Sequence, residues 1–568
     1  MSHPLKSSHI SYQDLLITYL KPQWARAFLM AALLLASIGL QLANPQILRS
    51  FIDTATSDSS ITPLIVAGAL FVGLSLLNQA VSIGATYLSE NVAWTATNQL
   101  RADLIAHCLT LDLAFHKART SGELIERIDG DVDTLSNFFS QAVVYLLGNI
   151  LLIVGILVLL FYEDWRVGLA LSIFALFALF VLTCLRTYAI RFWTEERQQD
   201  AEFFGFLGEQ LAGTEDVRAN GATGYVMRRF YQLLQRWYPI QRIASLSGYM
   251  MWIASLVVFA IGNALALALG AYLWSTKNIS LGTVYLIFYY TNLLNTPMEQ
   301  IRTQLQQLQQ AGAGIERVKQ LFQTQTTISD GKGVPLPAEA LSVLFHDVSF
   351  GYNADDPILQ HLDFHLPAGR VLGVLGRTGS GKTTLARLLL RLYDVQDGQI
   401  RLGGVEIRDA RLRDLRQCIG MVTQDVQLFH ATVRDNLTFF NRAISDEHIL
   451  AVLEDLGLST WYRSLPEGLD TELGSDGEGL SAGEAQLLAF TRVFLANPGL
   501  VILDEASSRL DPATEQLIER AVSKLLQGRT GIVIAHRLAT IQRADEIMII
   551  EDGRILEHDR RVTLTSDR

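Results

Sequence analysis

Six long apolar runs in the first 300 residues constrain the possible folds of this chain more than any other feature. Each run is about 20 residues long and carries almost no charge. They are Ala27–Ser50, Thr62–Leu88, Gln141–Tyr162, Val167–Leu185, Leu246–Thr276 and Ser280–Met298. A helix needs about 20 apolar residues to cross a bilayer core about 30 Å thick. One such run is compatible with a buried core helix, but six in one chain predict a membrane domain of six helices.

The overall composition agrees with a membrane protein. Of 568 residues, 49% are hydrophobic and 18% are charged, with a mean hydropathy of +0.25. Soluble domains carry roughly 25% charged residues. The net charge is −11, from 46 basic and 57 acidic residues, which argues against a general nucleic-acid-binding surface. We therefore expect membrane lipid, and no nucleic acid, among its partners.

The connections between the apolar runs predict the orientation in the membrane. Six crossings place both termini on one side, and two connections are unusually long and basic. Their basic residues include Arg101, Lys117, Arg119, Arg127, Arg191, Arg197, Arg218, Arg228, Arg229, Arg236 and Arg242. Short loops poor in lysine and arginine separate the other runs. Because basic loops stay on the cytoplasmic side, we predict a multi-pass protein of the plasma (inner) membrane with both termini cytoplasmic.

The two long connections also carry a helical pattern. Apolar residues recur at helical spacing in Thr95–Leu135 and in Arg197–Ala244, with breaks near His116–Gly122 and Gly213–Gly221. Each connection is predicted to be a pair of helices that leaves the membrane and turns around a short tip. Such a pair is either a solvated loop or a lever that contacts another domain, and the spacing alone does not separate the two.

The second half of the chain has the pattern of a soluble α/β domain. Ser329–Pro337 is typical of a linker. Short apolar runs of the kind buried in a doubly wound sheet follow at Val371–Leu375, Gly420–Thr423, Leu500–Leu503, Gly531–Ala535 and Glu546–Ile550. We therefore predict a membrane domain over residues 1–325, a linker over 326–340 and an α/β domain over 341–568.

The first of these strands leads into a phosphate-binding motif. Gly376-Arg-Thr-Gly-Ser-Gly-Lys382-Thr383 fits G-x-x-x-x-G-K-[ST] and is followed by a predicted helix over Thr384–Leu392. Glycines let backbone N–H groups turn inward around phosphate oxygens, and the positive end of the helix adds to them. In this motif Lys382 reaches the β- and γ-phosphates and Thr383 binds Mg²⁺. The predicted nucleotide-binding residues here are Gly376, Arg377, Thr378, Gly379, Ser380, Gly381, Lys382, Thr383 and Thr384.

A second strand, Leu500–Leu503, ends in two carboxylates, Asp504 and Glu505. Asp504 is suited to hold Mg²⁺, and Glu505 is suited to orient or deprotonate the attacking water. An acidic pair after a strand is also a common helix N-cap. The phosphate-binding motif favours the catalytic interpretation.

Between these motifs, Leu480-Ser-Ala-Gly-Glu484 resembles the Leu-Ser-Gly-Gly-Gln signature of ATP-binding cassettes. Five other residues, in four motifs, fit that family in the right order. Tyr352 is similar to the aromatic residue that stacks on adenine, Gln424 to the glutamine near Mg²⁺ and the γ-phosphate, Ser508 and Asp511 to the D-loop, and His536 to the switch histidine. Six helices with two long connections followed by a cassette resemble an ABC exporter half-transporter.

The resemblance implies an ATPase made of two chains, with ATP and Mg²⁺ as cofactors. Two cassettes of this family close head to tail, so that Leu480, Ser481, Ala482, Gly483 and Glu484 of one chain would cap the nucleotide held by the other. Glu505 would be the general base, His536 would hold the γ-phosphate and the water, and Gln424 would join Thr383 and Asp504 at Mg²⁺. The partner is a second half-transporter, either the same chain or a paired subunit.

Three features depart from the family pattern. Ala482 adds a methyl group where the signature has glycine, and Glu484 places a negative charge near the nucleotide unless it is paired. Ser475-Asp476 replaces the Glu-Arg that exporters have before the signature, which puts the contact with the loop tips in doubt.

The expected function is ATP-driven export of an amphipathic, lipid-like or drug-like compound. The membrane helices are rich in aromatic residues and poor in charge, which suits such a cargo, although the same residues serve helix packing and interfacial belts. Two alternatives remain open: an importer built on the exporter fold, and a membrane-bound regulatory ATPase that does not transport.

Overall fold

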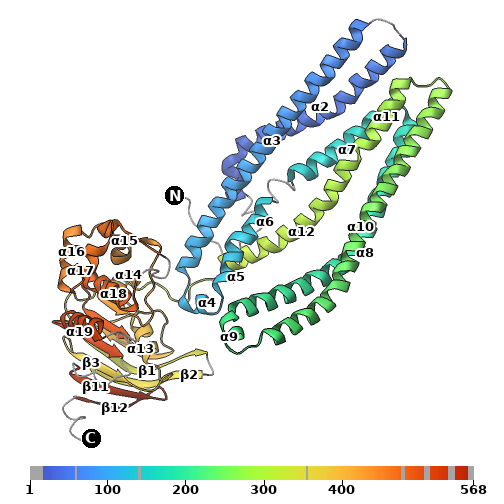
Figure 1. The fold of residues 1–568 in the computed structure, drawn as a ribbon. Helices are drawn as coiled ribbons and strands as arrows, with labels where there is room; N and C mark the ends of the chain where they lie inside the picture. Colours follow the sequence, from blue (N-terminus) through green and yellow to red (C-terminus); the bar gives the residue numbers. More distant parts are fainter. Residues whose placement is uncertain are drawn as a thin grey trace. The chain divides into compact units, whose positions relative to one another are not determined.

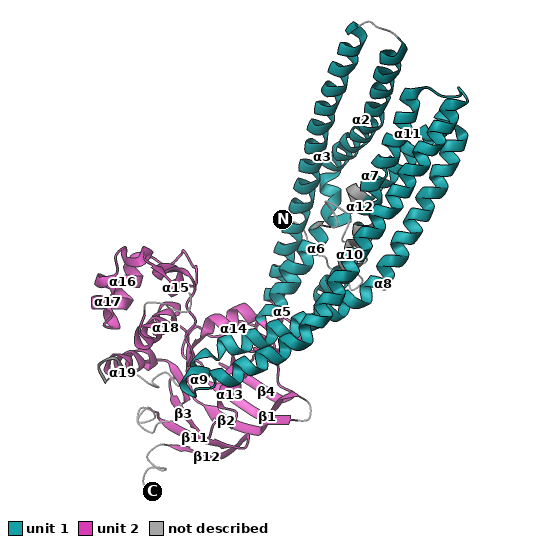
Figure 2. Ribbon diagram, turned by 45° about the vertical axis from the view of Figure 1, so that its right-hand side comes forward, with its two compact units in different colours: residues 1–109, 121–324 teal, residues 110–120, 325–568 magenta. Residues whose placement is uncertain are grey.

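The computed structural model describes residues 17–57, 61–137, 143–353, 356–474, 480–504, 512–534 and 544–560. The chain forms two compact units (Figure 2). Unit 1 comprises Met1–Leu109 and Ser121–Thr324, and unit 2 comprises Thr110–Thr120 and Gln325–Arg568. The short segment between residues 110 and 120 therefore belongs with the C-terminal half of the chain.

Unit 1 is made of helices (Figure 1). Its long helices are α2 (Trp24–Ser57), α3 (Ile61–Thr110), α7 (Val143–Glu163), α8 (Trp165–Ala212), α10 (Thr223–Ser275), α11 (Leu281–Leu293) and α12 (Asn295–Gln323). Its short elements are a 3₁₀-helix (Lys21–Gln23), α5 (Ser121–Ile125), a π-helix (Glu126–Gly130), α6 (Asp131–Asn137) and α9 (Thr214–Ala219). The predicted helical membrane domain is confirmed.

Five helices in the described part of the chain are long and apolar enough to cross a membrane. They correspond to the first five predicted runs. The sixth run, Ser280–Met298, is divided between α11 and α12 at Leu294. Pro297 explains the division, because its ring nitrogen has no hydrogen to donate to the carbonyl of the preceding turn. Leu294 keeps helical dihedrals (φ −67°, ψ −24°), so α12 continues in the direction of α11.

The helices of unit 1 pack around a narrow core and leave apolar side chains on the outside. Ile156 and Leu160 of α7 and Leu171 of α8 are fully buried in this core. Gly262 of α10 allows a close approach, since a Cβ there would lie 2.3 Å from the ring of Phe174. Outward-facing residues such as Phe180 (67% exposed) are apolar, as expected of a surface that faces lipid.

The two long connections fold as predicted. The first turns through α4 (Leu113–Lys117) and α5, which lie on either side of the predicted break near His116–Gly122. The second turns through α9 between α8 and α10, within the predicted break (Figure 1). A stacked pair, Phe203 and Trp237, joins the two helices of the second connection with ring centroids 5.5 Å apart.

Unit 2 is an α/β domain with three sheets. Its strands are β1 (Val343–Asn353), β2 (Asp356–Leu366), β3 (Val371–Leu375), β4 (Asp397–Leu402), β5 (Val405–Glu406), β6 (Ile419–Val422), β7 (Ala431–Thr432), β8 (Glu472–Leu473), β9 (Leu500–Asp504), β10 (Thr530–Ile534), β11 (Glu546–Glu551) and β12 (Arg554–Arg560). Its helices after the linker are α13 (Lys382–Leu389), α14 (Leu412–Cys418), α15 (Val433–Thr438), α16 (Asp446–Asp455), α17 (Ser459–Ser464), α18 (Ala482–Ala496) and α19 (Pro512–Leu526), with a 3₁₀-helix at Gly468–Asp470.

The central sheet has six strands in the order β12-β11-β3-β10-β9-β6. The neighbours from β11 to β6 are parallel, and β12 is antiparallel at the edge. All five predicted buried runs are strands of this sheet. An antiparallel sheet, β2-β1-β4-β5, and a β7-β8 pair complete the unit. Two cores flank the central sheet, one on the α13 side and one around α18 and α19.

Candidate ATP-binding site

Parallel pairing brings the functional segments of unit 2 to one edge of the central sheet. Strand β10 lies between β3 and β9, with Ile534 in register with Val374 on one side and Asp504 on the other. Strand β6 follows, with Val422 opposite Leu503. The carboxyl ends of parallel strands are where α/β proteins bind ligands. The segments that follow β3, β6 and β9 therefore begin at the same edge of the sheet.

The phosphate-binding motif forms a tight loop between β3 and α13. Gly379 (φ +89°) and Gly381 (φ +102°) adopt backbone conformations that favour glycine. A Cβ on Gly381 would also lie 2.5 Å from Leu359 Cδ2, so the Leu359 side chain would have to shift to accept one. The loop is held from within, because buried Lys382 donates through Nζ to the carbonyl oxygens of Gly376 (2.8 Å) and Arg377 (2.9 Å).

One polar atom in this loop has no protein partner. Ser380 is only 5% exposed, and its Oγ makes no hydrogen bond within the described part of the chain. A buried hydroxyl without a partner is costly and is found where a ligand or water completes it. Together with the N-terminus of α13, this hydroxyl fits a phosphate group held by the loop.

A cleft of about 790 Å³ beside the loop collects the three residues predicted to bind Mg²⁺. Thr383 comes from the start of α13, Gln424 from the loop after β6, and Asp504 from the end of β9. A hydroxyl, an amide and a carboxylate supply the oxygen ligands that Mg²⁺ prefers. The residues present therefore fit a magnesium–nucleotide site, and the donors reach it from three separate elements.

Tyr352 lies near the end of β1, next to the phosphate-binding helix. Its hydroxyl is 3.1 Å from Thr384 Oγ1 and accepts a hydrogen bond from Arg387 Nη1 at 2.8 Å. The ring packs edge-on against Phe350 and Tyr393 and remains 41% exposed. An aromatic face held beside the phosphate loop is suited to stack on a base. The sequence analysis did not identify Arg387 and Tyr393, which hold the Tyr352 side chain in place.

Arg492 is a further residue of the cleft that the sequence analysis missed. Arg492 comes from α18 and donates to the carbonyl oxygens of Asn436 (2.7 Å) and Gln427 (2.9 Å). Its guanidinium carbon lies 4.7 Å from the ring centroid of Phe439. Burial lowers the pKa of Arg492 to about 10, so it is still charged at neutral pH. The contacts tie α18 to the loop that follows Gln424. A helical arginine gives no local signal of such a role.

The signature segment begins α18. Ser481 is the N-cap of this helix, and Ala482 is its first residue. Glu484 closes a capping box: its Oε2 accepts from Ser481 N and from Ser481 Oγ, each at 2.8 Å, while its own N–H donates to Ser481 Oγ at 3.2 Å. Leu480 packs partly against the core, and Gly483 is buried. The Glu484 carboxylate is therefore hydrogen-bonded to its own helix start, and its negative charge lies beside Ser481.

Comparisons with known proteins agree with this architecture. Residues 27–298 match the family model described as the ABC transporter transmembrane region, and residues 359–508 match the one described as ABC transporter. The chain is 30% identical over 553 residues to YknV, an uncharacterized ABC transporter ATP-binding protein of Bacillus subtilis, covering 96% of this chain and 91% of that protein. The chain belongs to the ABC transporter family.

Two further relatives show which branch of the ABC transporters this chain resembles. It is 30% identical to the ATP-dependent lipid A-core flippase of Idiomarina loihiensis, over 95% of this chain and 93% of that protein. A bacterial Atm1-family ABC exporter, solved with ATP bound, superposes with a TM-score of 0.77 at 26% identity, over 96% of both chains. The chain is therefore an ABC exporter half-transporter, an integral membrane protein whose ATP hydrolysis is coupled to transport.

Several predicted ATPase residues lie outside the described residues. They are Glu505, Ser508, Asp511 and His536, together with Ser475 and Asp476 before the signature. Asp504, directly before Glu505, ends β9, and Ile534, two residues before His536, ends β10. The roles of the site residues stay predictions.

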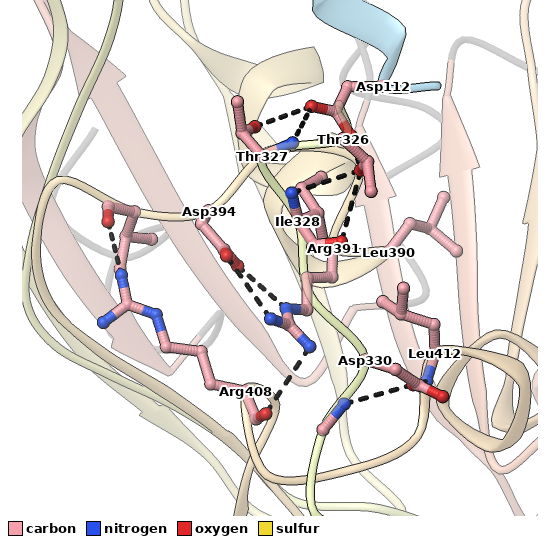
Figure 3. A network of polar contacts seen from close by, with 12 residues as sticks. Asp112, Thr326, Thr327, Ile328, Asp330, Leu390, Arg391, Asp394, Arg408 and Leu412 are labelled. Carbon is pink, nitrogen blue, oxygen red and sulfur yellow. Dashed lines mark hydrogen bonds and ion pairs between the residues drawn. The ribbon is translucent and has the colours of Figure 1, made fainter. Parts of the chain in front are cut away.

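The tip of the transporter's first helical connection is fixed to the segment that leads into its ATPase domain (Figure 3). The carboxylate of Asp112 accepts hydrogen bonds from Thr327 N and Thr327 Oγ1, each at 2.6 Å, and from Thr326 Oγ1. Burial alone would raise the pKa of Asp112, but hydrogen bonds from residues 326–328 outweigh it and hold the pKa below its usual value.

The same segment continues onto the ATPase domain. Asp330 Oδ1 accepts from Leu412 N at 2.8 Å, at the start of α14. Buried Arg391, near the end of α13, donates to Asp394 Oδ1 at 2.8 Å (Figure 3). Hydrogen bonds thus connect the first loop tip, the linker and helix α14 within unit 2. The sequence predicted the tip but not this attachment, because its partners are about 215 residues apart.

Proposed function

We propose that this half-transporter dimerises and uses ATP to export an amphipathic or lipid-like compound across the plasma (inner) membrane. On this proposal its termini and ATPase domain are cytoplasmic. The observation that carries the ATPase part is the cleft that Thr383, Gln424 and Asp504 line beside the phosphate loop. Identity of about 30% to a lipid A-core flippase supports the lipid-like cargo.

The residues of the cleft and of the phosphate loop would each contact a different part of the bound nucleotide. Tyr352 would stack on the adenine, while Ser380 Oγ and the backbone of the loop would donate to the phosphates. Lys382 would leave the carbonyls of Gly376 and Arg377 to pair with phosphate oxygens. Thr383, Gln424 and Asp504 would hold Mg²⁺, which neutralises charge on the β- and γ-phosphates.

Hydrolysis requires groups that act on the attacking water. Glu505 follows Asp504 and would take the proton from that water as general base. His536 would hold the γ-phosphate, and Ser508 and Asp511 would contact the partner subunit. These assignments come from the family resemblance and from their places after β9 and β10.

The signature would act on the nucleotide of the partner subunit. Ser481 caps α18 and presents its hydroxyl and the first N–H groups of that helix at one point. A γ-phosphate is a suitable ligand for such a helix start. One chain cannot supply both the phosphate loop and the opposing signature to the same nucleotide. The working unit is therefore a dimer, made either of two copies or with a paired subunit.

ATP turnover by the purified chain in lipid nanodiscs tests this proposal. We expect Mg²⁺-dependent hydrolysis that Glu505→Gln abolishes while ATP binding is retained. The matched control Glu519→Gln changes a carboxylate on α19, away from the cleft, and should keep full turnover. Turnover that persists in Glu505→Gln, or a loss of ATP binding in that variant, would contradict the assignment of the general base.

A further inference from the structure

A second cavity lies inside unit 1, among α2, α3, α7, α11 and α12. Its volume of about 330 Å³ is within the range of small-molecule sites. It has room for roughly ten water molecules, since each occupies about 30 Å³ in the liquid. The space is therefore large enough for a small polar head group but not for a whole lipid.

The wall of this cavity contains several polar side chains beside apolar ones, although it is formed by apolar helices. Ser37, Gln41, Ser82, Asn149 and Gln300 all contribute to it. Asn149 Nδ2 donates to Gln300 Oε1 at 2.9 Å, and Gln41 Nε2 donates to Ser37 Oγ at 3.2 Å. Polar pairs between membrane helices also hold the helices together. Helix association alone does not explain why these side chains surround a cavity.

Glu90 is the one ionisable side chain among the described residues that line the cavity. Within the described part of the chain, its carboxylate forms no hydrogen bond and no ion pair. Glu90 follows Ile61, the first residue of α3, by 29 residues. That places it about 44 Å along the helix, beyond a hydrocarbon core about 30 Å thick. This depth places Glu90 near the membrane interface.

We propose that this cavity binds the head group of the transported amphipath and selects a cationic head group that donates hydrogen bonds, such as a primary ammonium. This inference rests on the proposed export of an amphipathic compound. An ammonium has three donors and no acceptor. It would pair with the Glu90 carboxylate and with the hydroxyl and amide oxygens of the wall. An anionic head group would meet the negative charge of Glu90 instead.

The surroundings of the cavity suit the apolar tail of such a molecule. Leu34 and Ser82 line the cavity, and their sequence neighbours Leu35 and Ile83 are 56% and 61% exposed. The outer face of α2 and α3 beside the cavity is therefore apolar. A head group in the cavity leaves its alkyl chain in contact with this face and with lipid.

Matched single-chain amphipaths test the inference on the full chain in nanodiscs. Decylamine, decyl sulfate and decyl glucoside share one tail and differ only in head group, and the amine is protonated at pH 7. The readout is the thermal unfolding temperature of the protein, which needs no ATP turnover. We expect decylamine to raise it, and decyl sulfate and decyl glucoside to raise it much less.

Three variants show whether the cavity causes the effect. Glu90→Gln should need about tenfold more decylamine for the same rise. Glu195→Gln removes a charge from the exposed surface of α8, outside the cavity, and should respond as the unmodified chain does. Ser82→Leu keeps Glu90 but fills part of the cavity, and should lose the response. If Glu90→Gln does not fold, the decylamine response of Ser82→Leu decides the question.

The outcomes separate this inference from the proposed function. Equal decylamine responses in Glu90→Gln and the unmodified chain would overturn it, as would equal effects of the three head groups or a retained response in Ser82→Leu. ATP hydrolysis in the same samples reports on the proposed function. Hydrolysis without head-group discrimination refutes only the inference. Head-group discrimination without hydrolysis leaves the inference standing and refutes the proposed ATPase for a dimer of two copies of this chain.

Discussion

Replacing Glu484 by glutamine should make the transporter bind ATP more tightly during turnover. In the structure the Glu484 carboxylate accepts hydrogen bonds from both Ser481 N and Ser481 Oγ. On our proposal, Ser481 must also contact the γ-phosphate held by the partner subunit. The carboxylate therefore occupies the helix start that the phosphate needs and carries a charge of the same sign. Glutamine keeps a capping box possible but removes the charge.

The structure gives the size of the effect. Glu484 Oε2 lies 2.8 Å from Ser481 Oγ, and a phosphate oxygen bound to that hydroxyl would be at a similar distance, so the two negative groups would be at most about 6 Å apart. Two unit charges at that separation repel by about 0.7 kcal/mol in water and by about 2.8 kcal/mol at an effective dielectric of 20. Glu484 is half-buried and screened by salt, so we expect about 1 kcal/mol, or about a fivefold lower KM for ATP.

Steady-state ATP hydrolysis in nanodiscs, measured at low and high salt, is the assay. The KM for ATP should fall about fivefold in Glu484→Gln at low salt, and the difference should shrink at high salt because screening weakens charge repulsion. Glu447→Gln, at the exposed start of α16, is the matched control and should leave KM unchanged. An unchanged or higher KM in Glu484→Gln at low salt would refute the view that its charge opposes the partner's phosphate.

Three other predictions follow from the site and its attachment. Tyr352→Ala should weaken ATP binding by about 1–3 kcal/mol, as in other base–aromatic stacks, whereas Tyr352→Phe keeps the ring and should bind nearly normally; equilibrium binding of a fluorescent ATP analogue checks both. Gly381→Ala should weaken ATP binding by about 1–3 kcal/mol, because the backbone at this position has a φ of +102°, which strains any residue with a side chain, and normal binding would show that the loop tolerates alanine there. Asp112→Ala should cost about 1 kcal/mol locally, seen as about fivefold faster hydrogen exchange at the Thr327 amide. Folding lowers the pKa of Asp112. The stability that Asp112 contributes is therefore present at neutral pH and is lost as the pH falls through the lowered pKa. Equal exchange rates at the Thr327 amide in Asp112→Ala and the unmodified chain at pH 7 would contradict the prediction.

The sequence predicted elements better than the contacts between them. The apolar runs and the short buried strands were identified because length, hydropathy and spacing are local properties. The division of the sixth run at Leu294 depends on Pro297, whose effect on a helix is also readable from the sequence. By contrast, Pro239 lies within α10, and the helix continues on both sides of it. A proline in the sequence therefore does not by itself decide whether a helix ends or continues.

The same contrast, between local features that the sequence predicts and contacts between distant residues that it does not, holds for the candidate site. The phosphate loop and Asp504 were predicted from motifs that follow strands, and the pairing of β3, β10 and β9 explains why they meet. The Ser481–Glu484 capping box also has a local sequence signature, Ser-x-x-Glu at a helix start. The roles of Arg492 and Glu90 and the attachment of Asp112 to Thr327 could not be identified from sequence, because each depends on residues far away in the chain.

Transport of a fluorescent lipid in proteoliposomes tests the central claim most directly. The full chain is reconstituted, ATP is added outside, and an acyl-labelled phosphatidylethanolamine reports movement through its accessibility to an impermeant quencher. Vesicles in which the ATPase domain faces outward should protect a growing fraction of the label with ATP, and Glu505→Gln should not. ATP hydrolysis that Glu505→Gln abolishes, with no ATP-dependent change in label protection for this lipid or other amphipaths of any head-group charge, would contradict export of a lipid-like cargo.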